Sequence, residues 1–518
     1  MSDDLIAEPQ AEKPRAAEKP RAAKKQKPFK GTGFLRLWTG ESVSLVGTEI
    51  TFMAMGIIAV TTLAATPWQM GLLEAAESAA VLLLGLSAGV WADRYERRRI
   101  MLVANLARSV LVLIVPVLFW LDLLTMGALY AVVFLVGALS LLFDSAMSAY
   151  LPRLLPRSQL ERANSWMEGS ASVGMVAGPG LAGLLVQIVS APIALIVDSV
   201  SYLVSYATLS RLPKAPPSED PADPAEDAEE VKAVKADKGT DGTAASDRTV
   251  GPAHETRPAR AETVPVPVPA SVGEQREAPA VPPQETHRAQ VLKGLRVLRH
   301  DPVQRPMTLA AAHFNIFHSM FFAVNVLFLL RVLDFSPGLL GATSMAGGVA
   351  GLVGASCTPF LTRKLGQGPA LIVVYAVPGL AAVLVPLSAG TGRALAVVLV
   401  SVSTFVYTFA VVVNLVISDT VKQTLVPDHL LGRVTASTRF ISWGVQPVGA
   451  LLGGWLGTRF GLVEVMVTAS IGLSASALWP LLSPVRRLIT LPDDESDDDT
   501  LTADEADTEP GEGTGRSV

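Results

Sequence analysis

Ionisable side chains interrupt several long apolar stretches of this sequence. Glu41, Glu49, Asp144, His313 and His318 each stand among residues that are mostly aliphatic or aromatic. A charge inside a lipid-embedded helix is costly, so such side chains usually face a cavity or a partner and mark the path of an ion or a substrate. A carboxylic acid in a cavity of low polarity can hold a proton and release it when water or a substrate arrives. These residues therefore predict proton transfer within a membrane.

Glu49 is the principal candidate for a proton carrier. It lies nearest the middle of its apolar stretch and follows Glu41 by eight residues, so both carboxyl groups can share one helix face. Asp144 ranks second, because its place toward one end of its stretch suits an ion pair in a gate equally well. Arg94 and Arg97 are the partners expected for Asp144 in that alternative role.

Two histidines offer a second kind of chemistry. His318 is a candidate proton relay or substrate contact, and His313 is a candidate substrate contact on the same stretch. An imidazole changes its charge near neutral pH, which suits a relay, but it also serves as a hydrogen-bonded packing residue. Both roles stay open for each histidine.

Composition places these residues in a membrane protein. Half of the 518 residues are hydrophobic and 17% are charged, with a mean hydropathy of +0.41, which is too apolar for a soluble enzyme of this length. The single cysteine, Cys357, excludes a disulfide framework and a cysteine-based metal cluster. No phosphate-binding loop, nucleophile elbow, metal-ligand helix or nucleotide-binding motif is present, so ATP-driven transport and hydrolysis have no support. We expect no enzymatic activity, no cofactor, no metal and no nucleic-acid partner.

Twelve stretches are long and apolar enough to cross the hydrocarbon core, which takes about 20 residues. They are residues 37–64, 69–92, 100–121, 126–150, 163–189, 191–210, 307–332, 337–361, 369–389, 393–417, 435–457 and 462–483. The short connectors on one side of these spans hold eleven Lys and Arg residues, and those on the other side hold three. Because basic residues stay on the cytoplasmic side, we expect a multi-pass plasma-membrane protein with both termini in the cytoplasm.

The remaining segments divide the chain into two six-span units. We expect a basic tail at 1–33, six spans at 34–212, a linker at 213–288, six spans at 289–487 and an acidic tail at 488–518. The linker is rich in Pro, Ala and acidic residues and cannot bury enough apolar surface to fold. We expect the linker and both tails to be disordered in the cytoplasm, with a docking or phosphorylation segment as the alternative role.

The two units also repeat in sequence. LLPRSQLERAN at 154–164 aligns with LVPDHLLGRVT at 425–435, and this shift of 271 pairs Pro156 with Pro427. The same shift pairs glycines in the following span, and a shift of 270 places Arg94 on Lys364. Two matches in the same order at nearly one spacing predict a duplicated six-span unit. Two such halves around a central axis are a recurring architecture of secondary transporters.

The connector between the second and third spans carries the most specific motif. GVWADRYERRR combines a glycine, an acid and basic residues, namely Gly89, Asp93, Arg94, Arg97 and Arg98. This motif resembles the signature of the major facilitator superfamily. With the twelve spans and the internal repeat, the resemblance of the chain to this superfamily covers residues 34–212 and 289–487. Glu96 stands where the family has a glycine, so this turn forms without its most permissive residue. The resemblance implies an all-α membrane fold of two pseudo-symmetric six-helix bundles, with this motif as a cytoplasmic gate.

The fifth span carries a second motif of this superfamily. GSASVGMVAGPGLAG resembles the pattern of antiporter-type exporters at Gly169, Gly178, Pro179 and Gly183, with Ala182 where a glycine is usual. Small residues let a neighbouring helix approach closely, and a proline bends the span. Tight helix packing alone is the competing explanation for the glycine spacing.

Three further passages narrow the resemblance to one branch. LWTGESVSLVGTEIT, FDSAMSAYLPRLLPRSQLERAN and the Gly-Pro helix are similar to enterobactin exporters and macrolide-efflux proteins. This resemblance implies proton-coupled antiport that exports a hydrophobic or amphipathic small molecule, such as an antibiotic or a siderophore, by a monomer. The basic motif that many drug antiporters carry in span four is absent, and Arg108 in span three is the nearest embedded cation. An uptake symporter is the alternative function, and a non-transporting sensor is a more distant one.

The resemblance also selects the helices that line the cavity, which are spans one, four, seven and ten. They carry the carboxyl groups and histidines named above, and their other candidate substrate contacts are Phe52, Met53, Phe314, Phe321, Phe322 and Asn414. Such aromatic residues more often face lipid or pack against neighbours. Glu74, Glu77 and Asp198 lie in spans two and six and rank lower.

The signature motif yields a test of its gating role. If Asp93 latches the cytoplasmic face near Arg433 and the start of span eleven, Asp93→Asn should impair the transport cycle while the protein still inserts into the membrane. Transport assays on membranes with matched protein content measure the two effects separately. Normal transport by the variant would reduce the motif to a topology anchor.

Overall fold

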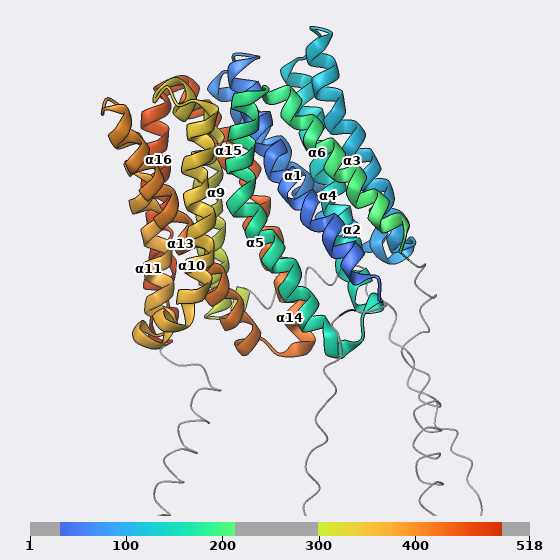
Figure 1. The fold of residues 1–518 in the computed structure, drawn as a ribbon. Helices are drawn as coiled ribbons and strands as arrows, with labels where there is room; N and C mark the ends of the chain where they lie inside the picture. Colours follow the sequence, from blue (N-terminus) through green and yellow to red (C-terminus); the bar gives the residue numbers. More distant parts are fainter. Residues whose placement is uncertain (1–28, 30–31, 213–298, 489–518) are drawn as a thin grey trace, which may run out of the picture.

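The computed structural model describes residue 29 and residues 32–212 and 299–488, without some of the side chains in these ranges. These ranges are built of helices and contain no strand (Figure 1). Most of the N-terminal tail, the linker and nearly all of the acidic tail lie outside the described residues, so the expectation of disorder there stays a prediction.

Helices occupy all twelve predicted crossings. The first half contains α1 (Phe34–Thr61), α2 (Pro67–Arg94), α3 (Arg97–Trp120), α4 (Met126–Leu154), α5 (Arg157–Ile188) and α6 (Ala191–Ser210). The second half contains α9 (Gln304–Arg331), α10 (Pro337–Leu365), α11 (Gln367–Ala382) with α12 (Leu384–Leu387), α13 (Arg393–Leu425), α14 (Asp428–Gly444) with α15 (Gln446–Phe460), α16 (Leu462–Ala475) with α17 (Leu478–Leu481), and the short 3₁₀ helix η1 (Pro484–Arg487). Three crossings of the second half are thus each divided between two consecutive helices.

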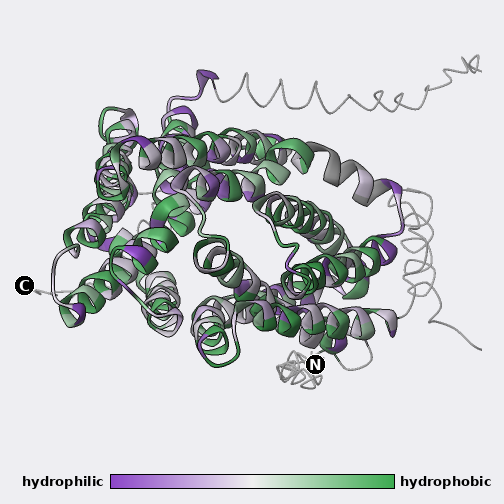
Figure 2. Ribbon diagram, turned by 90° about the horizontal axis from the view of Figure 1, so that it is seen from above, coloured by the Kyte–Doolittle hydropathy of each residue, from purple (hydrophilic) through white to green (hydrophobic). Residues whose placement is uncertain are grey.

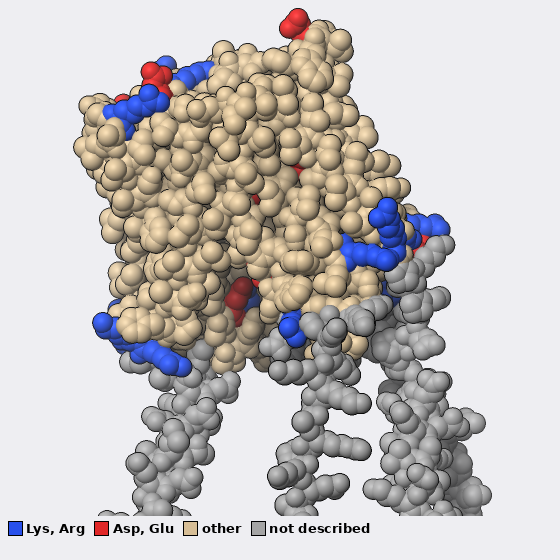
Figure 3. Space-filling model, viewed as in Figure 1, with Lys and Arg blue, Asp and Glu red and all other residues tan. Residues whose placement is uncertain are grey.

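The helices have the length and surface of membrane spans. Ten helical segments of the described chain are long and apolar enough to cross a bilayer. The other two crossings are α2 and the divided pair α14 and α15, whose 17 and 15 residues are each shorter than the roughly 20 that a span needs. Most of the helical ribbon is hydrophobic (Figure 2), and the face seen in Figure 3 carries a broad belt that is nearly free of charged residues. The prediction of an all-α, multi-pass membrane protein is confirmed.

The repeat seen in the sequence is also a repeat in structure. Thr66 and Ser336, 270 residues apart, each cap a helix, and the hydroxyl of each accepts a 3.3 Å hydrogen bond from a backbone N–H in the first turn. A proline follows each cap at the first helical position, where its missing N–H costs nothing. Pro156 and Pro427, 271 residues apart, are the N-cap residues of α5 and α14. The two halves therefore start equivalent helices with equivalent residues.

Two of the contacts between the halves pair glycine with glycine, and the same repeat relates them. A Cβ atom on Gly183 of α5 would lie 2.5 Å from the carbonyl oxygen of Pro337 and 2.8 Å from the Cα of Gly341 on α10. A Cβ atom on Gly454 of α15 would lie 2.9 Å from the Cα of Gly71 on α2. Only glycine permits backbones to approach this closely.

These contacts lie at one end of the molecule. We call the end where α1 begins and η1 ends the tail end, and the opposite end the closed end. At the closed end the Arg331 Nη2 donates a hydrogen bond across the halves to the carbonyl oxygen of Val60, at 3.4 Å. Toward the tail end, a Cβ atom on Gly85 or Gly169 would meet no described atom within 4 Å. Between the halves the surface is hollowed near the tail end, with charged side chains inside the hollow (Figure 3).

The glycine contacts predict a sharp local effect on stability. Gly183→Ala should lower the free energy of unfolding by about 1–3 kcal/mol, because the new methyl group overlaps backbone atoms of α10 that cannot rotate away. Titration with sodium dodecyl sulfate, followed by circular dichroism, measures this loss. Gly127→Ala on α4 is the matched control, since its Cβ would meet only the hydroxyl of Thr125 at 3.9 Å. Equal stability of both variants would contradict the close-contact argument.

Candidate functional site

A buried arginine forms the centre of the first half. Arg108 of α3 is 4% exposed, and its guanidinium lies 4.6 Å from the ring centres of both Phe143 and Tyr202. It donates hydrogen bonds to the side-chain oxygen of Asn105 and, at 3.2 Å, to the hydroxyl of Ser140. Two aromatic faces and two acceptors replace part of the water that the cation loses on burial.

Three carboxyl groups from three helices interact electrostatically with Arg108. They are Glu41 of α1, Asp144 of α4 and Asp198 of α6, and Glu41 also interacts with Asp144. Glu41 is 8% exposed and its Oε2 has no hydrogen-bond partner among the residues that the structure describes, whereas Asp144 is exposed. Asp198 is fully buried and accepts hydrogen bonds from Thr51 and, at 2.7 Å, from Ser201. We call Arg108 and these three acids the Arg108 cluster.

The Arg108 cluster has more acids than cations. If all three carboxyl groups were ionised, the cluster would carry a net charge of −2 inside the membrane, where uncompensated charge is costly. One or two bound protons bring the net charge to −1 or zero. The cluster can therefore take up and release protons while Arg108 keeps one carboxylate compensated.

The sequence alone did not predict the Arg108 cluster, because two of its four residues were not among the leading candidates. Glu41 and Asp144 were candidates, but Asp198 was ranked lower because it lies in span six, and Arg108 was noted only as the nearest embedded cation. A signal was available, because Arg108 and Asp198 each interrupt a strongly apolar span. An ionisable residue in an apolar span is expected to have a partner, but the sequence does not identify that partner. The packing of α3 against α4 and α6 identifies it.

Glu49 lies in different surroundings from Glu41. Its half-buried side chain lines a cavity of about 200 Å³ between the halves, together with Pro179, Phe321 and Phe322. Its charged neighbour is Glu77 of α2, with which it interacts electrostatically. Glu41 faces a cation and Glu49 faces another acid, although both stand on α1.

The two histidines point in opposite directions. The Nδ1 of His318 lies 2.5 Å from the Tyr407 hydroxyl, and the His318 ring packs against Phe314 and Phe322. The Nε2 of His313 lies 2.9 Å from the carbonyl oxygen of Gly472, which is on α16 rather than in the cavity between the halves. The structure thus places His318 inside the second half and His313 against its outer helices.

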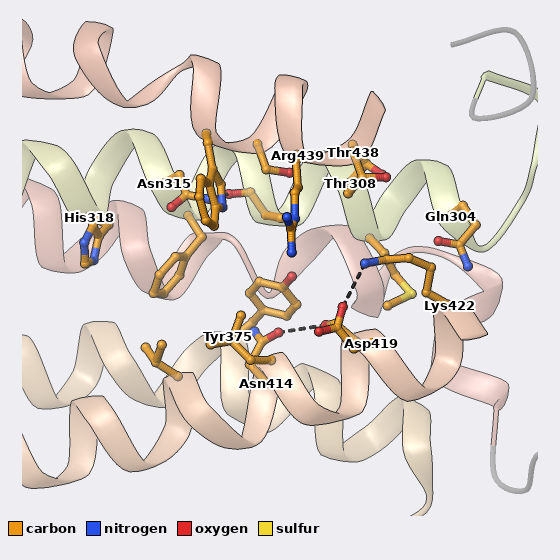
Figure 4. A pocket seen from close by; sticks show the side chains of 18 of the residues that line it. Gln304, Thr308, Asn315, His318, Tyr375, Asn414, Asp419, Lys422, Thr438 and Arg439 are labelled. Carbon is orange, nitrogen blue, oxygen red and sulfur yellow. Dashed lines mark hydrogen bonds and ion pairs between the residues drawn. The ribbon is translucent and has the colours of Figure 1, made fainter. Parts of the chain in front are cut away.

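A larger cavity of about 340 Å³ opens within the second half, and we call it the tail-side pocket (Figure 4). Its polar side chains come from five helices and are Gln304, Thr308, Asn315, His318, Tyr375, Asn414, Ser418, Asp419, Lys422, Thr438, Arg439, Ser442 and Gln446. Phe314 and Trp443 are its larger apolar walls. Its volume is within the range of about 300–1,000 Å³ that small-molecule sites occupy.

The other predicted substrate contacts separate into three groups. Asn414 and Phe314 line the tail-side pocket, while Phe321 lines the cavity beside Glu49. Met53 is half-buried and packs against the hydrophobic cores of both halves. Phe52 is 40% exposed and lines neither cavity.

The signature motif lies at the junction of α2 and α3. The side chains of Gly89 and Asp93 lie outside the described residues, so the predicted latch stays a prediction. Arg94 is exposed in the last turn of α2, and Arg97 is the first residue of α3. Arg98 donates to the carbonyl oxygens of Leu209 at 3.2 Å and Ser210 at 2.5 Å. Both oxygens lie in the last turn of α6, so Arg98 binds the negative end of that helix.

The motif in α5 packs between α1 and α10. A Cβ atom on Gly178 would lie 2.4 Å from the Cβ of Glu49, and one on Gly341 would lie 2.5 Å from the carbonyl oxygen of Pro179. Gly183 makes the closed-end contact described above, whereas Gly169 has open space around it. Close helix packing therefore accounts for three of the four motif residues in this conformation.

The Arg108 cluster predicts how the protein responds to loss of its cation. Arg108→Gln should lower the free energy of unfolding by about 3–5 kcal/mol, because it leaves buried carboxyl groups without their counter-ion. Detergent-based unfolding titrations measure the change. Arg393→Gln, at an exposed helix start, is the control and should change stability by no more than about 0.5 kcal/mol. A loss equal to that of the control would show that Arg108 compensates no buried charge.

Comparisons with known proteins relate this architecture to membrane transporters. The chain is 24% identical to multidrug efflux pump Tap of Mycolicibacterium fortuitum over 426 residues, which cover 79% of this chain and 86% of that protein. It is 25% identical to macrolide efflux protein A of Streptococcus pyogenes over 187 residues, or 35% of this chain and 45% of that one. Over this and other short matches the chain spans less than half the length of the curated relatives, 42 to 45%.

The fold is shared with solved transporter structures. A variant of nucleoside transporter NupG aligns with a TM-score of 0.65 at 10% identity, covering 87% of this chain and 99% of that one. At this identity the likeness shows a common fold. The family model of the Major Facilitator Superfamily matches residues 37–445, which is most of the chain. The chain therefore belongs to the major facilitator superfamily of membrane transporters.

Proposed function

We propose that this protein is a proton-coupled exporter of an amphipathic small molecule, working as a monomer in the cell membrane. The observation that carries the coupling is the Arg108 cluster, in which one buried cation serves three carboxyl groups from α1, α4 and α6. Glu41 and Asp144 are the proton carriers in this proposal, and Asp198 holds Arg108 in place.

Asp144 supplies the route to this cluster. It is exposed and interacts with both Glu41 and Arg108, so a proton can pass from the surface through Asp144 to the buried carboxyl group. The positive-inside bias of the connectors supports a cytoplasmic location of the tail end in this proposal. Substrate would then enter from the cytoplasm, and opening of the closed end would release it outside.

Two features favour export over uptake. The chain is similar to proteins named for macrolide and multidrug efflux, and the small residues of α5 resemble the antiporter-type motif. In an antiporter the proton and the substrate occupy the protein alternately. A carboxyl–arginine cluster suits this exchange, because a proton arriving on Glu41 or Asp144 frees Arg108 from one of its partners and changes the charge inside the first half.

Inverted membrane vesicles provide the test of coupling. An exporter should accumulate its substrate inside energised inverted vesicles, and a protonophore should abolish the accumulation; depletion would indicate an uptake symporter. The compounds come from a resistance profile in an efflux-deficient host, with a macrolide in the panel. Glu41→Gln and Asp144→Asn should each abolish gradient-driven accumulation yet retain substrate exchange without a gradient, because exchange needs no proton transfer.

Two further variants separate the Arg108 cluster from the other candidate. Glu464→Gln, exposed near the closed end, is the control and should transport normally. Glu49→Gln tests the carboxyl group that sequence position favours. If Glu49→Gln abolishes accumulation while Glu41→Gln and Asp144→Asn leave it intact, Glu49 is the proton carrier and the Arg108 cluster has a structural role.

A further inference from the structure

The tail-side pocket has an excess of positive charge. Its three charged side chains are Asp419 and Lys422 of α13 and Arg439 of α14. The Lys422 Nζ donates to the Asp419 Oδ1 at 2.8 Å, so these two charges compensate each other. Among the described residues no carboxylate lies within ion-pair distance of Arg439. Within the described part of the chain, one cation in this pocket therefore has no counter-ion.

Arg439 extends into the pocket from α14. Its side chain points toward Tyr375 and Asn414, on the opposite wall (Figure 4). Its guanidinium lies 5.8 Å from the ring centre of Trp443, one turn further along the helix. The indole face holds the cation without neutralising it. The five N–H donors of the guanidinium stay available for an acceptor in the pocket.

The surrounding groups suit a ligand with an apolar body and a polar end. The aromatic rings of Phe314, Tyr375 and Trp443 form apolar walls, and Asn414 accepts a 2.9 Å hydrogen bond from Ser418. The Gln446 Nε2 donates to the Asn315 Oδ1 at 3.1 Å, which joins α15 to α9 at the edge of the pocket.

We propose that the tail-side pocket binds an amphipathic organic anion, with Arg439 as the anchor for its carboxylate or sulfonate. A planar acid group accepts two parallel hydrogen bonds from a guanidinium, and Trp443 and Phe314 cover the apolar body. A cationic ligand would instead have to approach the uncompensated Arg439. The statement that the anion is the exported substrate rests on the proposed exporter function. The statement that the pocket binds the anion does not depend on transport.

Dansylglycine is the probe, and dansylglycinamide, which has the same apolar body without the negative charge, is its neutral match. Binding to the purified full-length protein in dodecyl maltoside is followed by dansyl fluorescence and by energy transfer from tryptophan. Dansylglycine should bind about tenfold or more tightly than the amide, the difference that one charged hydrogen-bonding partner contributes. Arg439→Gln should remove this difference, and Arg439→Lys should restore part of it.

Three controls keep the outcome specific. Arg459→Gln, at the exposed closed-end terminus of α15, should bind dansylglycine as the unmodified protein does. Trp443→Phe should reduce energy transfer more than affinity, which places the probe beside residue 443. An unchanged thermal unfolding temperature of Arg439→Gln shows that this variant is folded. If Arg439→Gln is unstable, Arg439→Lys and the comparison of dansylglycine with its amide still test whether Arg439 binds the acid group.

Three results would overturn the proposal. They are equal affinity for the acid and the amide, undiminished preference for the acid in Arg439→Gln, and displacement of dansylglycine by phosphatidylglycerol in mixed micelles, which would assign Arg439 to a lipid headgroup. The exporter function is judged separately in vesicles. If the protein exports in a proton-driven way but shows no preference for the anion, only the proposed anion site is rejected. If it binds the anion but shows no proton-driven transport, only the proposed exporter function is rejected.

Discussion

The architecture depends on two close contacts between glycines. Gly183 meets Gly341 on one side of the molecular axis and Gly454 meets Gly71 on the other, and each pair leaves no room for a side chain. Lipid gives little hydrophobic driving force between helices, so close packing of small residues has to hold the halves together. Because both contacts lie at one end, the halves stand apart at the tail end, and the hollow between them follows from this geometry.

The two halves share a backbone plan but differ in chemistry. The first half concentrates titratable groups around Arg108, and the second half holds a polar pocket with amide and hydroxyl groups. Asn414 stands within one position of the residue that corresponds to Asp144 in the repeat, so an amide occupies the place of an acid. Duplication supplied equivalent positions, and substitution at those positions gave the two halves different side-chain chemistry, which is the basis for our proposal that one half carries protons and the other binds substrate.

Much of the plan could be predicted because it depends on short-range patterns. Apolar length predicts the spans, Pro156 and Pro427 mark equivalent helix starts, and the small residues of the fifth span indicate close packing. The site was predicted less well. Glu41 and Glu49 were expected to act on one face, but Glu41 faces Arg108 whereas Glu49 faces Glu77. Helical periodicity gives the direction of a side chain and not the helix that it meets.

The sequence by itself determined the membrane setting, the helical crossings, the duplicated halves and the family, because each of these follows from composition, periodicity or motifs that lie close together in the chain. Only the tertiary structure decided which charges are partners. Arg108 and Asp198 are 90 residues apart in sequence, yet packing of α3 against α6 brings them together. Electrostatic interactions act over a few ångströms of space, and separation along the chain does not predict that distance.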